Sequence, residues 1–354
     1  MTKRIRVGVI GLGRVAQLHH LPALAESPRA ELTTLCDLSQ ELAAYLARDY
    51  GLPPGAVATD AGDLLSRDLD GVVIANRHHG PLVRQALEAG LCVLVEKPAC
   101  WTVDEGIALA DLEQRTRPAV VGYMKRYDPA VRRLVESEPP AVFVRLHVFA
   151  GARHRYEKLH RRIEGHDVAA HLAGAEDQVI SGLIADALGP GPAGRQREVR
   201  TMAELAIHDI NLARALLGPL SVDSARRFAT PYGTAFIGVL SGSGTPVSLE
   251  IVPDFQTARD WDETLTVYYP GGLTELRLGS PFRRSAPTVI YEHLASGTDI
   301  VSRKTVVSYD SAYRLELEHF LDCAADDAQS STPIADAVAD LRLVYDIVRI
   351  AEDL

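Results

Sequence analysis

The chain has 354 residues, 47% of them hydrophobic and 24% charged, which indicates globular domains rather than collagen-like or disordered sequence. Its net charge of −10 argues against a nucleic-acid partner, because such binding needs clustered Lys and Arg. The apolar run near the N-terminus spans only about five residues, too short for a signal peptide or a membrane span. Four cysteines without a CxxC or zinc spacing predict no disulfide framework, so we expect a soluble protein of the reducing cytoplasm.

The N-terminal third alternates between strand and helix patterns. Short apolar runs suit parallel strands buried on both faces, and they occur at Ile5–Ile10, Glu31–Cys36, Val72–Ala75, Cys92–Val95 and Ala119–Val121. Helical patterns lie between them, at Val15–Ala25, from an N-cap at Ser39 to Tyr50, and at Pro81–Ala89 and Val103–Gln114. This alternation predicts an α/β Rossmann domain with a doubly wound parallel sheet over residues 1–122.

The character changes after Asp128-Pro129, and we expect a second, α+β domain over residues 123–354. A strand is predicted at Ala141–Phe149, and strands with turns from Ala225 to Ser308 indicate a mostly antiparallel sheet. The predicted helices are Asp167–Ala187, Met202–Leu217, Tyr313–Ala325 and Ile334–Asp353. Residues 152–200 form an atypical insert rich in histidine and arginine.

A dinucleotide-binding motif follows the first predicted strand. Gly11-Leu12-Gly13-Arg14-Val15-Ala16 fits GxGxxA, in which glycines permit a tight turn and close approach to the pyrophosphate. Asp37 ends the second predicted strand, where a carboxylate can bind the adenosine-ribose hydroxyls. That carboxylate would repel the 2′-phosphate of NADP, and Leu38-Ser39-Gln40 contains no arginine to neutralise it. We therefore expect NAD as the cofactor, with NADP possible if an arginine such as Arg14 intervenes.

A second motif, Glu96-Lys97-Pro98, ends the predicted strand Cys92–Val95. A lysine there points into the crevice where ligands bind in parallel sheets. It could hydrogen-bond a substrate hydroxyl and help to move its proton. The alternative is a lysine that merely ends the strand and pairs with Glu96.

These motifs, in this order, resemble the Gfo/Idh/MocA oxidoreductases, a family that includes glucose-fructose oxidoreductase and inositol dehydrogenase. The resemblance continues through two further segments, which are Val121-Gly122-Tyr123-Met124-Lys125-Arg126-Tyr127-Asp128-Pro129 and Ala206-Ile207-His208-Asp209-Ile210-Asn211-Leu212. It reaches the last two helices and covers most of the chain except residues 152–200. It implies a second domain with a large open sheet, which often forms a subunit interface, and hence a homo-oligomer.

The resemblance also implies the catalytic residues. Lys97 matches the family's catalytic lysine, and His208 matches its histidine. Glu204 stands where many members have an aspartate one helical turn before that histidine. Residues four apart share a helix face, so we expect Glu204 and His208 to point at one substrate.

The remaining expected site residues come from the matching segments. Ala75, Asn76 and His79 are assigned to the cofactor together with Glu96, Lys97 and Pro98, whereas Tyr123 and Arg126 join Lys97, Glu204 and His208 as substrate-binding residues. The segment Ala75–His79 departs from the family's Thr-Pro-containing loop, and we expect His79 to start a helix rather than to act as an acid or base. Arg77 could line the cofactor or reach an acidic substrate group.

The insert carries His154, His160, His166, Asp167 and His171, but their spacings do not place two ligands on one helix turn, so we expect no metal site. The insert could cap the active site or extend an oligomer interface.

The expected reaction is hydride transfer between NAD(P) and a secondary alcohol or ketone of a sugar, sugar derivative or cyclitol. The alternatives are a redox-neutral lyase or glycosidase that uses transient oxidation, and a nucleotide-sensing regulator without turnover.

Overall fold

A computed structural model describes residues 4–137, 140–151, 160, 162–169, 172, 174–191, 194–231, 233–255, 261–284 and 286–353. The chain divides into two compact units, each described by itself below. The first unit comprises Met1–Tyr123, Arg161–Pro190 and Tyr313–Leu341, and the second comprises Met124–His160, Gly191–Ala312 and Arg342–Leu354. The two expected domains met near residue 122, but the structure groups part of the insert and a C-terminal segment with the first unit.

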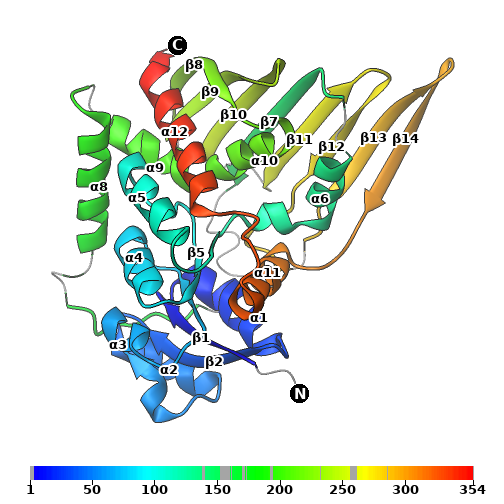
Figure 1. Cartoon of the computed structure of the whole chain (residues 1–354). Helices are drawn as coiled ribbons and strands as arrows, with labels where there is room; N and C mark the ends of the chain where they lie inside the picture. Colours follow the sequence, from blue (N-terminus) through cyan, green and yellow to red (C-terminus); the bar gives the residue numbers. More distant parts are fainter. Residues whose placement is uncertain are drawn as a thin grey trace. The chain divides into compact units, whose positions relative to one another are not determined.

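A parallel sheet forms the centre of the first unit (Figure 1), with strand order β3-β2-β1-β4-β5-β6 within the described ranges. Its strands are β1 (Ile5–Ile10), β2 (Ala30–Cys36), β3 (Val57–Ala58), β4 (Gly71–Ile74), β5 (Cys92–Val95) and β6 (Ala119–Val121). The central strands β4 and β5 are buried along their whole length, as expected for continuous apolar runs covered on both faces. The expected Rossmann fold is confirmed, and its parallel strands direct their carboxyl ends to one edge.

Helices connect and flank these strands. They are η1 (Ala16–His20), α1 (Leu21–Glu26), α2 (Gln40–Asp49), η2 (Pro54–Ala56), α3 (Ala61–Leu65), α4 (Gly80–Glu88), α5 (Val103–Glu113), α8 (Ala175–Leu188), α11 (Ala312–Asp326) and α12 (Ile334–Ile350, which continues into the second unit). The cap expected at Ser39 is confirmed, because its hydroxyl accepts a hydrogen bond from the Leu42 N–H at 3.0 Å. The helix expected from Asp167 begins instead at Ala175, after Gly174 with its positive φ of 81°.

A large open sheet dominates the second unit, with order β14-β13-β12-β11-β7-β10-β9-β8-β15 within the described ranges. Its strands are β7 (Phe143–Gly151), β8 (Ser221–Thr230), β9 (Gly233–Gly242), β10 (Thr245–Phe255), β11 (Asp262–Tyr269), β12 (Gly272–Arg277), β13 (Val289–Ser296), β14 (Asp299–Val306) and β15 (Glu352–Asp353). Most neighbours are antiparallel, as expected, although β10 with β7 and β15 with β8 are parallel.

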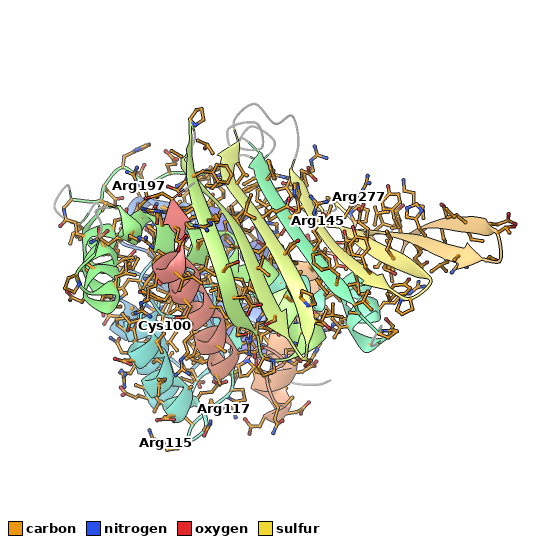
Figure 2. The ribbon with its side chains drawn as sticks, turned by 90° about the horizontal axis from the view of Figure 1, so that it is seen from above. Cys100, Arg115, Arg117, Arg145, Arg197 and Arg277 are labelled. Atoms are coloured by element: carbon orange, nitrogen blue, oxygen red, sulfur yellow. The ribbon has the colours of Figure 1, made fainter. Side chains whose placement is uncertain are left out.

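Side chains of this sheet alternate between a buried and an open face. On β7, Val144, Leu146 and Val148 are buried. Between them, Arg145 binds the Glu250 carboxylate of β10 through two hydrogen bonds of 2.9–3.0 Å. Figure 2 shows the side chains on these strands and labels Arg145 and Arg277.

Among the described residues of the second unit, the helices are η3 (Met124–Tyr127), α6 (Pro129–Glu136), α9 (Arg195–Glu204) and α10 (Ile207–Leu217). The single helix expected over Met202–Leu217 was wrong. Helix α9 ends at Glu204, where Leu205 has φ −116° and ψ −67°, and α10 begins at Ile207. The helical path that should join Glu204 to His208 is therefore interrupted.

Candidate active site

The glycine loop after β1 is tightly packed at its first glycine and open at its second. Gly11 has φ +85°, and a Cβ there would lie 2.7 Å from the Ala75 carbonyl carbon and 2.8 Å from the Asn76 Cα. A Cβ at Gly13 would meet no heavy atom within 4 Å. The Gly13 carbonyl accepts from the Gln17 N–H at 3.0 Å, so the helix starts at this open point. Ala16 is fully buried and lets the helix pack against the sheet.

The Asp37 carboxylate at the end of β2 is held by two backbone N–H groups. Leu12 donates to Oδ2 at 2.8 Å, and Ser39 donates to Oδ1 at 2.9 Å. These bonds tie Asp37 to the glycine loop and still leave carboxylate lone pairs that can accept from ribose hydroxyls. An open second glycine, a helix N-terminus and a positioned carboxylate together fit a dinucleotide, so Arg14, Val15 and Ala16 remain in the cofactor-binding role predicted for them.

Lys97 lies two residues beyond the end of β5, and its peptide bond to Pro98 is cis. His79 is the N-cap residue of α4 and is 3% exposed. Its Nδ1 donates to the Pro98 carbonyl oxygen at 2.7 Å, and burial lowers its pKa despite this bond. His79 is therefore a neutral group that holds the turn next to Lys97.

A buried hydrogen-bonded pair lies next to this turn, formed by Glu96 and His20, which are 76 residues apart in sequence. Glu96 Oε1 and His20 Nε2 are 2.9 Å apart, and the two side chains are 11% and 1% exposed. Burial opposes ionisation of Glu96, but the His20 hydrogen bond and the charges of His20 and Lys97 outweigh it and lower the Glu96 pKa. Sequence reasoning missed His20, because no local pattern distinguishes it on its helix.

Glu316 of α11 lies in the same interior and is fully buried. Burial, and then the Glu96 charge, raise its pKa well above the ordinary value and so favour the neutral carboxyl. Glu96 is thus the ionised member of the two and the one that supports Lys97 electrostatically.

The loop after β4 is bound by the insert, which sequence reasoning did not foresee. Asn76 Nδ2 donates to the Glu176 carboxylate of α8 at 2.7 Å, and the Arg77 N–H donates to the same carboxylate at 3.3 Å. The Arg77 guanidinium also pairs with Asp177 at 2.5 Å. Asn76 and Arg77 therefore bind the start of α8, and the Ala75 N–H ties this loop to β1 by donating to the Ile10 carbonyl at 2.8 Å.

In the second unit, His208 is the second residue of α10 and is 9% exposed. Asn211 lies three residues further on, on the same helix face, and its Oδ1 accepts from the Arg126 guanidinium at 3.3 Å. The structure thus brings Arg126 to the face of α10 that carries His208.

A buried charged cluster underlies that face. Lys125 pairs with Glu263, and its Nζ lies 3.9 Å from Asp209 Oδ1. Burial raises the Asp209 pKa, and the Lys125 ammonium lowers it only in part. The cluster connects η3, α10 and β11 and was not recognised in the sequence.

Glu204 and Tyr123 lie in surroundings that the sequence did not predict. Glu204 ends α9 and binds Arg200 of the same helix at 3.0 Å, whereas His208 lies in the next helix, α10. Tyr123 is 1% exposed, and the buried Asp340 of α12 acts electrostatically on its hydroxyl. Burial, followed by Asp340, raises the Tyr123 pKa well above its usual value. Its placement indicates a packing role in the first unit.

The insert carries five candidate metal ligands, of which His154 and His171 lie outside the described residues. Asp167 is bound by Ser39 and by the Glu41 N–H. Within the described ranges, no group of three or more His, Cys, Asp or Glu residues could hold a metal ion. The absence of a metal site stays a prediction.

Comparisons with known proteins show which sequences and structures this chain resembles. Residues 5–123 match the model of the Gfo/Idh/MocA oxidoreductase family, described by its NAD-binding Rossmann fold. The N-terminal part of the chain is thus similar to these oxidoreductases, in agreement with the resemblance drawn from its motifs.

Among individual proteins, the chain is similar in sequence to inositol dehydrogenases. One is the inositol 2-dehydrogenase/D-chiro-inositol 3-dehydrogenase of Shouchella clausii (strain KSM-K16), 33% identical over 137 residues, which are 38% of this chain and 40% of that protein. Another is the scyllo-inositol 2-dehydrogenase (NAD(+)) of Bacillus subtilis (strain 168), 28% identical over 300 residues, covering 73% of this chain and 82% of that protein. The match to the first relative therefore spans less than half of its length.

Solved structures share the fold over the whole chain. A 3-ketoreductase from Actinomadura kijaniata, in complex with TDP-benzene and NADP, superposes with a TM-score of 0.74 at 17% identity and covers 99% of each chain. The UDP-N-acetylglucosamine 3-dehydrogenase of Acidithiobacillus ferrooxidans reaches 0.73 at 17% identity and 98% of each chain. At this identity the likeness shows the fold alone.

Proposed function

We propose that the protein is an NAD-dependent oxidoreductase that transfers hydride between the nicotinamide and a secondary alcohol or ketone of a sugar, sugar derivative or cyclitol. One observation carries this proposal. The carboxyl ends of parallel strands bring the glycine loop, Asp37 and Lys97 to a single edge of the first sheet. The inositol dehydrogenases among the relatives support cyclitols as the first substrates to test.

The proposed roles follow from the chemistry of each side chain. The cofactor, when bound, supplies the hydride acceptor or donor. Lys97 orients the substrate oxygen and stabilises the negative charge that develops on it, with Glu96 and His20 fixing the strand end behind it. In the second unit, His208 accepts the hydroxyl proton in the oxidation direction, and Arg126 and Asn211 order the same helix face.

The cofactor preference is assigned to Asp37. Its carboxylate accepts from ribose hydroxyls and repels a 2′-phosphate, so the unmodified protein should prefer NAD. Replacing Asp37→Ser together with Leu38→Arg should weaken NAD binding and improve NADP binding. A wide preference of the unmodified protein for NADP would contradict this assignment.

The decisive experiment incubates the purified protein with NAD and a panel of inositol stereoisomers and sugars while NADH absorbance is followed. Net NADH formation with a cyclitol or sugar supports a dehydrogenase. Substrate conversion without net NADH would indicate a redox-neutral lyase or glycosidase. Tight NAD binding without turnover of any compound would indicate a regulator.

We further propose that two copies associate through the open face of the second sheet. Ile237 and Val239 of β9 project from this face with 44% and 41% exposure. Light scattering would report the assembly, and Ile237→Glu should dissociate it.

We also propose a reducing cytoplasmic location, for which all four cysteines, buried free thiols, are the support. Among the described helices, none is long and apolar enough to cross a membrane. A free-thiol count below four in protein from its native cells would contradict this location.

A further inference from the structure

Part of the insert crosses the cofactor edge of the first unit. We call residues 162–169 the strap; in Figure 1 it is the green trace that runs toward α2 and α3. Ile163 and Gln17 exchange two hydrogen bonds of 2.9 and 3.0 Å, which dock the strap on the helix that follows the glycine loop. Gly165 then packs on the start of α2, since a Cβ there would lie 2.5 Å from the Ser39 Cβ.

Asp167 of the strap binds the N-terminus of α2. The Ser39 hydroxyl donates to Oδ1, and the Glu41 N–H donates to Oδ2 at 3.0 Å. The Glu41 carboxylate in turn accepts from the His166 N–H at 3.2 Å. The Ser39 hydrogen bond, followed by that of the Glu41 N–H, lowers the Asp167 pKa, so this side chain is an anion at pH 7.

Ser39 connects this anion to the residue already assigned to the adenosine ribose. Its N–H donates to Asp37 at 2.9 Å while its hydroxyl donates to Asp167. A helix N-terminus attracts anions through its unpaired N–H groups and its dipole. A 2′-phosphate beside Asp37 would need donors of this kind, but the strap has filled them with its own carboxylate.

We propose that Asp167 is a second determinant of cofactor specificity, which excludes NADP by occupying and charging the position that a 2′-phosphate would use. This inference rests on the proposed NAD-dependent function. Asp37 discriminates through its own charge next to the ribose, whereas Asp167 acts from a segment 128 residues away in sequence that closes over the same corner.

The test compares the dissociation constants of NADH and NADPH, measured by fluorescence titration, in the unmodified protein and in Asp167→Asn. The variant keeps the side-chain shape and removes the charge. NADPH should bind at least about tenfold more tightly, the scale expected when one like charge facing a phosphate is removed, and NADH should change less than about threefold. Because the effect is electrostatic, it should shrink at high salt.

Two further variants separate charge from docking. Glu164→Gln removes a strap charge that pairs only locally with Arg162 at 3.4 Å, and it should leave both dissociation constants unchanged. Gly165→Val keeps Asp167 but prevents close packing on Ser39, and it should favour NADPH as Asp167→Asn does.

An unchanged ratio of NADPH to NADH affinity in Asp167→Asn, with NADH binding intact, would overturn the inference and leave the proposed function standing. Equal tightening of both nucleotides would also overturn it, because the strap would then compete with the whole cofactor. If the unmodified protein bound neither nucleotide, the proposed function itself would fail.

Discussion

The two glycines of the nucleotide loop should respond oppositely to the same added methyl group. In Gly11→Ala, the new Cβ must occupy φ +85°, which costs a residue with a Cβ about 1–2 kcal/mol. It would also lie 2.7–2.8 Å from backbone atoms of Ala75 and Asn76, which cannot rotate away as a side chain could. Overpacking of this kind costs about 1–3 kcal/mol. We therefore expect Gly11→Ala to lower the free energy of unfolding by about 2–5 kcal/mol, a large part of the usual 5–15 kcal/mol.

Gly13→Ala is the matched control for stability. No heavy atom lies within 4 Å of its added Cβ, so the unfolding free energy should change by less than about 1 kcal/mol, the scale of a helix-start substitution. The methyl group would instead face the pyrophosphate, which needs close backbone approach. NADH affinity should therefore fall at least about tenfold, or about 1.4 kcal/mol, in a protein that remains fully folded.

Urea unfolding followed by tryptophan fluorescence, without nucleotide, gives the stabilities, and NADH titration of the folded variants gives the affinities. A Gly11→Ala protein as stable as the parent would refute the packing argument for the first glycine. A Gly13→Ala protein that binds NADH at parental strength would refute the assignment of the open space to the pyrophosphate.

Four other outcomes follow from the site. Lys97→Met should leave NADH affinity nearly unchanged and reduce turnover at least about 100-fold in a steady-state assay; near-parental turnover would remove Lys97 from the chemistry. His208→Asn should likewise leave NADH affinity nearly unchanged and reduce turnover. A loss of NADH affinity without a loss of turnover would argue for a structural role of His208. Glu96→Gln should lower the unfolding free energy at pH 7 by about 1.5–3 kcal/mol, the worth of a hydrogen bond to a charged group. Since the folded pKa of Glu96 is lowered, its contribution is present above the unfolded pKa and is lost as pH falls through the folded pKa, so parent and variant should converge in acid urea titrations. Glu316→Gln should have the opposite pH dependence. Because the folded pKa of Glu316 is raised, the parent loses stability as pH rises above the unfolded pKa, and the stability of the variant relative to the parent should increase between pH 5 and pH 8. A constant difference in unfolding free energy would show that Glu316 does not titrate as its burial requires.

Elements with a strong local signal could be predicted from the sequence. The strand Cys92–Val95 matches its prediction residue for residue, because a short apolar run between helical patterns suits only a strand buried on both faces. Ser39 was predicted as a cap because its hydroxyl satisfies an N–H group within the same helix turn. The helix Pro129–Glu136 had comparable signals, with Asp128 as N-cap and proline at the first position, and should have been predicted.

Features that depend on distant partners could not be predicted in the same way. The composition of residues 167–174 is compatible with a helix, but Asp167 is bound to α2, and the helix starts only after Gly174. The break between Glu204 and Ile207 has no glycine or proline to mark it. The Glu96–His20 pair joins residues whose proximity arises only once the sheet has formed. The candidate site was thus predicted at its motifs and missed at its supporting contacts.

The first unit has a consequence for how the protein is made on the ribosome. The edge of its strand β6 is completed by Thr332, whose carbonyl accepts from the Val121 N–H at 2.8 Å and whose hydroxyl donates to the Val121 carbonyl at 2.9 Å. The ring of Phe320 packs against Gly71, where a Cβ would lie 2.7 Å from its Cζ. These residues are translated after every strand of the second sheet except β15, so the nucleotide-binding unit waits with an exposed strand edge until synthesis is nearly finished. We therefore expect this strand edge to need chaperone protection during translation, although β6 is made before the strands of the second sheet.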